Sequence, residues 1–442
     1  MLLATMAKVK DPLAEITSLC KRRGFVFQSS EIYGGLNSCW DCGPLGVALK
    51  RNIKDLWWNS MIAHGDIEGL DSSILMAPKV WEASGHIENF TDPLVDCKKC
   101  KARFRADKAP TDEAGKILCP ECGSDQVTEA RNFNLMFKTF MGPVENKGNE
   151  VFLRPETAQG IYVNFQNVAS SMRRTVPFGI CQIGKAFRNE ITPGNFIFRT
   201  REFEQMEMQF FVHPEEDQKW MDHWMEKRYQ WHLNMGINEK KLRKHPHGPK
   251  ELAHYAKSAF DIEYEFPFGW SEIEGVHNRT DFDLNRHQEY SKKNLTYVDV
   301  KRNNERYIPY IIETSVGADR SMLSVLCDAY HEDSENERIV MRFSPKVAPV
   351  KAAILPLQKK GELGELSQNV YKDLQSHWAC QYDDGGSIGK RYRRQDEIGT
   401  PFCLTLDFDS LEDKKVTVRH RDSMKQDRID LSNVKDFLKD NL

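Results

Sequence analysis

Two close pairs of cysteines form the most specific local pattern in the chain. Cys97 and Cys100 are separated by two residues, as are Cys119 and Cys122, and 18 residues lie between the pairs. Two such pairs can place four thiolates tetrahedrally around one Zn²⁺ ion, which leaves no open coordination position. The pattern predicts a zinc ribbon with a structural metal. Unpaired buried cysteines or redox chemistry are the alternatives, and the doubled pairing argues against them.

Arginines and aromatic residues gather in a second region. Arg188 and Glu190 follow Phe187 at the end of a predicted strand, and Phe198-Arg199-Thr200-Arg201-Glu202-Phe203 lies on the strand that returns. Arginines beside an aromatic ring on neighbouring strands can hold phosphates and stack on a base, which predicts nucleotide binding. A row of cross-strand ion pairs explains these charges equally well.

A third segment favours the nucleotide. Gly317-Ala318-Asp319-Arg320 opens a predicted helix, where free backbone N–H groups attract anions and Arg320 can hold a terminal phosphate. The segment is a weak signal by itself. Together with the arginines of the preceding hairpin, this segment makes phosphate binding a better interpretation than cross-strand ion pairs.

The apolar pattern indicates the elements that must position these residues. Helical spacing begins at a proline and is followed by a short strand closed by Pro78, and two later strands joined by a turn predict a long antiparallel hairpin. A further strand leads into the helix that carries Arg320. In chain order the expected elements are a helix at 44–61, a strand within 70–78, strands at 179–187 and 196–212 joined by a turn at 192–195, a strand at 306–313 and a helix at 318–331.

Composition shifts divide the chain into domains. A lysine-rich stretch at 96–128 predicts a small zinc module, and polar helical sequence predicts a second, mostly helical insertion at about 213–270. After Ser344, alternating strands and helices imply a separate α/β domain. We therefore expect domains at 1–344 and 345–442. The second should contain strands at 352–357, 380–382, 402–408 and 415–419, helices at 363–377 and 431–438, and a basic segment at 387–394.

Length and composition limit the class of protein. The chain has 442 residues, 40% of them hydrophobic, without the roughly 18 consecutive apolar positions of a membrane span. Lys8 and Lys10 interrupt the apolar N-terminus, so no signal peptide is expected. The net charge of −3 excludes a generally basic nucleic-acid binder, but not a local basic patch. The 11 cysteines are better suited to metal binding in a reducing compartment than to disulfides, so we expect a cytoplasmic protein.

Together these segments resemble the class II aminoacyl-tRNA synthetases. The helix from Pro44 with Pro78 resembles motif 1, Arg188 with the returning strand resembles motif 2, and Arg320 resembles motif 3. Longer segments are similar to the homodimeric glycyl-tRNA synthetases, namely RGFVF at 23–27, EIYGG at 31–35 and RPETAQG at 154–160. The resemblance implies an α+β fold, with an antiparallel-sheet catalytic domain that contains the zinc ribbon and a C-terminal α/β anticodon-binding domain.

The same resemblance implies an activity and an ATP site. Glycine would be activated with ATP and Mg²⁺ to glycyl-adenylate and then transferred to the 3′ end of tRNA(Gly). By similarity Arg188 binds the α-phosphate, Phe203 stacks on adenine and Arg320 reaches the γ-phosphate, with Glu190 the third catalytic residue. Glu272 is a candidate Mg²⁺ ligand. The implied ATP site is Arg188, Asn189, Glu190, Phe198, Arg199, Thr200, Arg201, Glu202, Phe203, Glu272, Ile273, Gly317, Ala318, Asp319 and Arg320.

Glycine offers an ammonium, a carboxylate and no side chain, so its site needs acidic groups and walls that exclude a methyl. The resemblance supplies three pocket glutamates, Glu156, Glu207 and Glu313, and two arginines, Arg279 and Arg105, as carboxylate or active-site arginines. The implied glycine site is Arg105, Glu156, Phe203, Glu204, Gln205, Met206, Glu207, Arg279, Glu313, Thr314, Ser315, Val316 and Gly317. Cys42 and Thr314 depart from the tyrosine and proline usual in the family, and neither stands at a charge-bearing position.

The resemblance also implies partners. The basic segment from Ser387 to Arg394 would contact the anticodon of tRNA(Gly), since arginine and lysine beside an aromatic ring suit phosphates and unstacked bases. Motif 1 implies a homodimer, and no membrane partner is expected. A synthetase-like binding protein without catalysis is the main rival, and retention of Arg188, Arg320 and the pocket glutamates argues against it. A synthetase for serine, threonine or proline is a second rival, and the RPETAQG segment speaks against it.

Overall fold

The computed structural model describes residues 11–63, 65–249, 251–252 and 256–442. The N-terminal segment through Lys10, for which no signal peptide is expected, lies outside these residues. Within them, no helix is both long enough and apolar enough to cross a membrane. Helices combine with a seven-stranded sheet, a five-stranded sheet and smaller sheets, which confirms the predicted α+β class.

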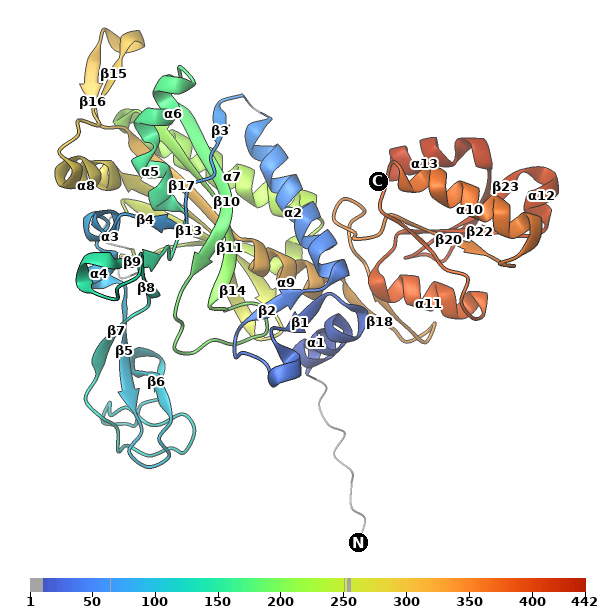
Figure 1. Cartoon of the computed structure of the whole chain (residues 1–442), viewed down its shortest axis with the longest axis horizontal. Coiled ribbons are helices and arrows are strands. Elements are labelled where there is room, and N and C mark those ends of the chain that lie inside the picture. Colours follow the sequence, from blue (N-terminus) through green and yellow to red (C-terminus); the bar gives the residue numbers. More distant parts are fainter. Residues whose placement is uncertain (1–10, 64, 250, 253–255) are drawn as a thin grey trace.

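A seven-stranded sheet forms the centre of the larger part of the molecule (Figure 1). Its order is β12-β13-β14-β17-β11-β10-β3, and neighbouring strands are antiparallel except for β3 with β10. The strands are β3 Ile67–Gly69, β10 Phe178–Phe187, β11 Glu202–Val212, β12 Leu242–Pro246, β13 Ser258–Phe266, β14 Gly269–Thr280 and β17 Tyr310–Gly317. The predicted hairpin of β10 and β11 is present, but residues 196–201 belong to its loop.

The two faces of this sheet differ because successive side chains of a strand point in opposite directions. Met206 and Met208 on β11 pack with the helices α2 (Pro44–Ile62), α7 (Asp217–Met235) and α9 (Ala318–Ala329) in the main core. The opposite face carries polar residues near its centre. Its far end is covered by α5 (Ala158–Val163), α6 (Phe165–Ser171) and α8 (Phe282–Ser291), which bury a second apolar cluster.

The chain between β3 and β10 builds the walls beside the polar face. Pro78 begins helix α3 (Pro78–Ala83), and the strand before it is only β4 (Leu75–Met76). The predicted short strand before Pro78 is therefore present, and Pro78 itself starts the next helix, because a proline at the first helical position has no N–H to lose. The remaining elements are α4 His86–Asn89, β8 Lys138–Phe140 and β9 Glu150–Leu153, and the ribbon strands β5 Thr91–Asp96, β6 Arg103–Arg105 and β7 Arg131–Asn134.

Several smaller elements surround the sheet. Helix α1 (Pro12–Arg23) precedes the first of three two-stranded hairpins. The hairpins are β1 Val26–Gln28 with β2 Trp40–Cys42, β15 Tyr297–Asp299 with β16 Glu305–Tyr307, and β18 Tyr330–Asp333 with β19 Arg338–Met341.

The prediction of a mostly helical insertion at about 213–270 is wrong. Helix α7 occupies only its first half, and the second half forms β12 and β13 of the central sheet. Ile262, Tyr264 and Phe266 are buried at two-residue spacing, which is the period of a strand. The alternation of these apolar residues with Glu263 and Glu265 is a strand signal that the helical interpretation of the segment overlooked.

The C-terminal part has its own five-stranded sheet, in the order β21-β20-β22-β23-β24. Helices α10 and α13 pack on one face and α11 on the other. The predicted strands and helices are present, but the basic segment opens a helix, and β24 was not predicted. The elements are β20 Ala352–Pro356, α10 Gly361–Gln375, β21 Cys380–Tyr382, α11 Ile388–Ile398, β22 Phe402–Leu406, α12 Asp409–Asp413, β23 Lys415–His420, β24 Gln426–Asp430 and α13 Val434–Asn441.

Buried charges join the two parts. Arg338 on β19 donates to Asp396 on α11 at 3.0 Å, and Arg419 on β23 donates to the same carboxylate at 2.9 Å. Arg23 at the end of α1 also pairs with Glu397. Helix α11 is therefore held on the larger part by ion pairs at two points.

Candidate active site

A cavity opens on the polar face of the central sheet, where β11, β14 and β17 lie side by side. Alternate residues of β11 and β17 line it, as expected for side chains that share one face, and on β14 the alternation is interrupted between Glu272 and Gly275, where the register shifts. The lining consists of Glu156, Arg188, Glu190, Ile197, Phe198, Arg199, Thr200, Phe203, Gln205, Glu207, Glu272, Gly275, His277, Arg279, Glu313, Ser315, Gly317, Asp319 and Arg320.

Three glutamates gather deep in this cavity. Glu313 accepts from Gln209 Nε2 at 2.8 Å, and the same amide donates to Glu207 at 3.2 Å. Glu207 also accepts from the hydroxyl of Thr157. Glu156 accepts from Gln159 Nε2 at 2.9 Å. The three carboxylates thus stand on different elements but share one polar network.

Arg279 compensates part of this negative charge. It is 4% exposed and donates to both oxygens of Asp283, at 2.7 and 3.0 Å, and to Glu313 at 3.1 Å. A buried guanidinium between two carboxylates satisfies its own hydrogen bonds. Arg279 therefore fixes Glu313 in place, and its charge is already neutralised within the protein.

The three glutamates differ in how readily they bind a proton. Burial opposes ionisation of Glu156, yet the charge of His86 lowers its pKa to about 2. Burial also opposes ionisation of Glu313, but Arg279 and His277 hold its pKa below the usual range. Burial raises the pKa of Glu207 well above its usual range, and the charges of Glu313 and Glu156 raise it further. The site therefore holds two ionised carboxylates and one that takes up a proton more easily.

His86, to which the sequence analysis gave no role, contacts one of the three glutamates. Its Nε2 lies 3.4 Å from Glu156 Oε2, and its Nδ1 lies 2.8 Å from the hydroxyl of Ser84. The ring also packs against Trp81 and Phe90. His86 thus fixes the orientation of Glu156.

Arg188 stands nearer the mouth of the cavity, between two aromatic rings. Its guanidinium carbon lies 5.4 Å from the centre of the Phe90 ring and 5.3 Å from that of Phe203. Nε donates to the carbonyl of Pro155 at 3.0 Å. Within the described part of the chain, no carboxylate oxygen lies within ion-pair distance of Arg188. Its positive charge is held by neutral groups.

Arg320, at the start of α9, lies on the other side of the mouth. Its guanidinium stacks at 4.5 Å on Phe198 and donates to the carbonyl of Phe198 at 3.3 Å. It also lies 3.2 Å from the Glu272 carboxylate, which is 47% exposed. This partner is open to solvent, so a phosphate can replace it at small cost.

Several residues of the implied sites do not reach the cavity. On β11, Glu204 and Met206 point to the opposite face, where Glu204 pairs with Lys50 and Lys54 of α2. The same alternation turns Thr314 and Val316 of β17 away, and the buried Thr314 hydroxyl has no hydrogen-bond partner among the described residues. Also outside the lining are Asn189, Arg201, Glu202, Ile273 and Ala318, of which Ile273 and Ala318 belong to the main core.

Arg105 also lies outside the cavity. It stands on ribbon strand β6 and donates to Asp92 at 2.7 Å and to Asp107 at 2.7 Å. The prediction of a carboxylate-binding role for Arg105 is thus not supported by its position here.

Three lining residues were missed by the sequence analysis, namely Ile197, Gly275 and His277. Gly275 and His277 precede Arg279 at two-residue spacing on β14. That spacing, counted back from Arg279, could have identified them.

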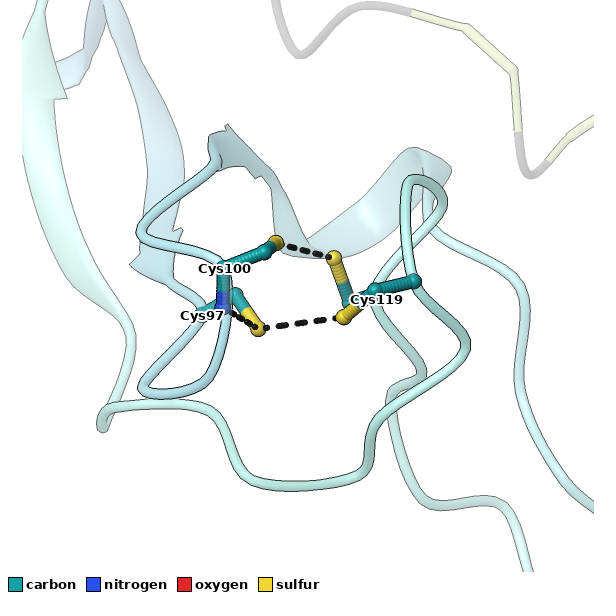
Figure 2. Close-up of side chains that lie close together, drawn as sticks. Cys97, Cys100 and Cys119 are labelled. Carbon is teal, nitrogen blue, oxygen red and sulfur yellow. Dashed lines mark hydrogen bonds between the residues drawn. The ribbon is translucent and has the colours of Figure 1, made fainter.

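The four paired cysteines converge as predicted. Figure 2 shows Cys97 and Cys100 facing Cys119 across the ribbon. Sγ of Cys97 lies 3.7 Å from that of Cys122, and Sγ of Cys100 lies 3.5 Å from that of Cys119. Sulfurs placed tetrahedrally at about 2.3 Å from Zn²⁺ are about 3.8 Å apart, so the donor set fits the ion. The N–H of Cys100 donates to Cys97 and lowers the pKa of its thiol to about 6, which favours the thiolate that binds metal.

The basic segment of the C-terminal part is only partly available to a ligand. Arg391 is 6% exposed and donates to the carbonyls of Pro356 and Gly386. Arg394 pairs with Asp383 at 2.7 Å, and Arg393 donates to the carbonyl of Asn336 at 2.6 Å. Lys390 is exposed. The hypothesis that the whole segment is a nucleic-acid surface must exclude Arg391, which holds α11 on its sheet.

Known proteins match both parts of the chain. The family described as tRNA synthetase class II core domain (G, H, P, S and T) matches residues 137–330, and an anticodon binding domain matches residues 351–441. A glycine–tRNA ligase of Treponema denticola is 58% identical over 428 residues, 95% of each chain. One of Bacillus cereus is 55% identical over 452 residues, 96% of this chain and 98% of its own. One of Geobacillus thermodenitrificans is 53% identical over 453 residues, 96% and 97% of the two chains.

Proposed function

Since the chain belongs to the glycine–tRNA ligases of the class II synthetase family, we propose that the cavity on the central sheet is its active site. The protein activates glycine with ATP to glycyl-adenylate and transfers the glycyl group to the 3′ end of tRNA(Gly). One observation carries the assignment of the site. A single cavity holds Glu156, Glu207 and Glu313 in its depth and the partly accessible Arg188 and Arg320 at its mouth, which matches the charges of the two substrates.

Glycine binds in the depth of the cavity in this proposal. Its ammonium lies among Glu156, Glu207 and Glu313, whose partners within the protein already hold them in place. An ammonium beside Glu207 favours the ionised form of that carboxyl. The substrate carboxylate then points toward Arg188 at the mouth.

ATP binds at the mouth of the cavity. Arg188 neutralises the α-phosphate, and adenine stacks on Phe203, whose ring already faces a guanidinium. Arg320 holds the γ-phosphate and exchanges its contact with Glu272, which is then free to bind the Mg²⁺ that accompanies ATP. Attack of the glycine carboxylate on the α-phosphorus needs alignment and charge neutralisation, which these groups supply without a protein nucleophile.

We infer that the ribbon binds one structural Zn²⁺ through Cys97, Cys100, Cys119 and Cys122. The separation of the four sulfurs supports this assignment. Residues 345–442 form a separate domain that binds the anticodon region of tRNA(Gly), through Lys390 and the other accessible positions of its basic segment.

We propose that the protein acts as a homodimer in the cytoplasm. Apolar side chains are exposed between β1 and the first turn of α2, among them Ile32 at 89%, Tyr33 at 87% and Val47 at 53%. A second copy of the chain would cover them. Sedimentation at micromolar concentration should give a dimer, and Ile32→Asp should shift it toward the monomer. A wild-type monomer would contradict the proposal.

The assignment of the cavity is tested by amino-acid-dependent exchange of pyrophosphate into ATP. Glycine should support exchange, and Glu156→Gln should raise the KM for glycine more than the KM for ATP. Arg320→Ala should raise the KM for ATP more than the KM for glycine. Equal effects of the two variants on both substrates would contradict the proposed placement of the substrates.

A further inference from the structure

The register of the central sheet puts two small residues in the middle of its polar face. Gly275 on β14 pairs with Ser315 on β17, and Ser315 pairs with Glu207 on β11. On its other side Gly275 pairs with Asp261 on β13. Directly paired residues of an antiparallel sheet point to the same face. The two small residues therefore leave a hollow between the carboxylates of Glu207 and Asp261.

His277 closes one side of this hollow. Its Nδ1 lies 2.8 Å from Glu313 Oε1. A Cβ atom added to Gly275 would lie 2.7 Å from Cε1 of His277 and 3.2 Å from its Nε2. The edge of the imidazole thus lies over Gly275, and the hollow is narrow because this ring fills part of it.

The imidazole is held in that position from two directions. Glu313, which it contacts, is fixed by Arg279 at 3.1 Å. The ring of His247 lies beside it, with a centroid separation of 6.1 Å, and His247 is itself 2.9 Å from Asp261. The contact with Glu313 and the neighbouring His247 ring both restrict movement of the imidazole. It is a fixed wall of the cavity.

We propose that His277 is a specificity-determining residue, whose imidazole fills the volume that the side chain of any amino acid larger than glycine would enter. The inference rests on the proposed glycine site. With the ammonium among Glu156, Glu207 and Glu313, the α-carbon of the substrate lies over Ser315 and Gly275, beside the imidazole. An alanine methyl at that position would collide with a ring that has no room to retreat.

Two variants of the full chain separate the bulk of the ring from its hydrogen bond. His277→Ala removes both, and His277→Leu keeps a similar volume but removes the contact with Glu313. Pyrophosphate exchange is measured with glycine and with alanine, and the selectivity is the ratio of the two kcat/KM values. We expect this ratio to fall by about tenfold or more in His277→Ala, because the space for one methyl group is worth about 10- to 200-fold. In His277→Leu it should stay within about threefold of the wild type.

The outcomes distinguish this inference from the site on which it rests. Slower glycine exchange in both variants with an unchanged ratio would overturn the inference and leave the glycine site in place, since His277 would then only orient Glu313. Wild-type kinetics with both amino acids in His277→Ala would count against the site itself. Thermal unfolding shows whether each variant is folded. If His277→Ala does not fold, His277→Asn, which is smaller than the imidazole but keeps a donor for Glu313, should also lower the ratio, and an unchanged ratio there would overturn the proposal.

Discussion

The two ends of the cavity use arginine in different ways. In the depth, Arg279 is buried and faces two carboxylates, Asp283 and Glu313. At the mouth, Arg188 is held by a carbonyl and two aromatic rings. A guanidinium that is neutralised by the protein builds the pocket, whereas one held by neutral groups keeps its charge for a polyphosphate. Substitution of Arg279 should therefore lower the stability of the protein, whereas substitution of Arg188 should lower its catalytic rate.

The largest expected effect on stability is that of Arg279→Ala. It leaves Glu313 and Asp283 buried without their cation, which typically costs about 3–5 kcal/mol. Chemical denaturation should show this loss. Arg188→Ala is the matched control, because no buried carboxylate depends on it. Equal destabilisation by the two substitutions would contradict the comparison.

The largest expected effect on catalysis is that of Arg188→Ala. Loss of a group that stabilises charge in the transition state typically lowers the rate about 10²- to 10³-fold. Glycine-dependent pyrophosphate exchange should fall by about this factor, with little change in thermal unfolding. Arg188→Lys should recover part of the rate, since it keeps the charge but not the stacking. Near-normal exchange in Arg188→Ala would contradict the proposed ATP site.

Cys119→Ser tests how the zinc ribbon supports the cavity, at its ATP-binding mouth and at its glycine-binding depth. Phe90, which stacks on Arg188, directly precedes ribbon strand β5. Loss of a thiolate should release Zn²⁺ and loosen the ribbon. Because Phe90 also packs against His86, which orients Glu156, we expect the KM values for ATP and for glycine both to rise, together with loss of zinc in metal analysis. Freshly purified wild-type protein without zinc would refute the metal site.

Charge reversal at Lys390 should leave the binding of glycine and of ATP unchanged. The residue is exposed on α11, so Lys390→Glu should raise the KM for tRNA and reduce its dependence on salt. Lys439→Glu is the control, because Lys439 is exposed on α13, which packs on the opposite face of the same sheet. Arg391→Glu should instead unfold the domain. A change in pyrophosphate exchange by Lys390→Glu would show that the domain takes part in adenylate formation.

The smallest expected effect is on the pH dependence of stability, through Glu156 in the glycine-binding depth of the cavity. The pKa of Glu156 is about 2 in the folded protein, below the value of about 4.3 for an unfolded glutamate. Ionised Glu156 therefore stabilises the fold above the unfolded value, and this contribution is lost as the pH falls toward 2. The difference in stability between wild type and Glu156→Gln should shrink over that range. In a His86→Ala background the difference should be small at every pH, and a persistent difference would assign the shift to another group.

The sequence predicted the elements and segments of the site better than its individual side chains. The residues 203–207 and 313–317 were each assigned as continuous runs, yet only alternate members face the cavity. Which of these residues face the cavity depends on which face of the central sheet is covered by α2, α7 and α9. His86 and His277 were not assigned a role, because each acts on a glutamate distant in the chain. The strands β12 and β13 were missed because the helical interpretation that fits α7 was extended through the residues that follow it.

By itself, the sequence determined the family, the paired cysteines and the order of the elements, because these depend on residue types at short spacings. Only the tertiary structure decided which charges are neutralised within the protein. Arg279 meets Glu313 from 34 positions away, and Arg391 meets the carbonyl of Pro356 from 35 positions away. Arg188 meets two rings and no carboxylate among the described residues. An arginine becomes part of the framework or remains available to a ligand according to partners that only the folded chain brings to it.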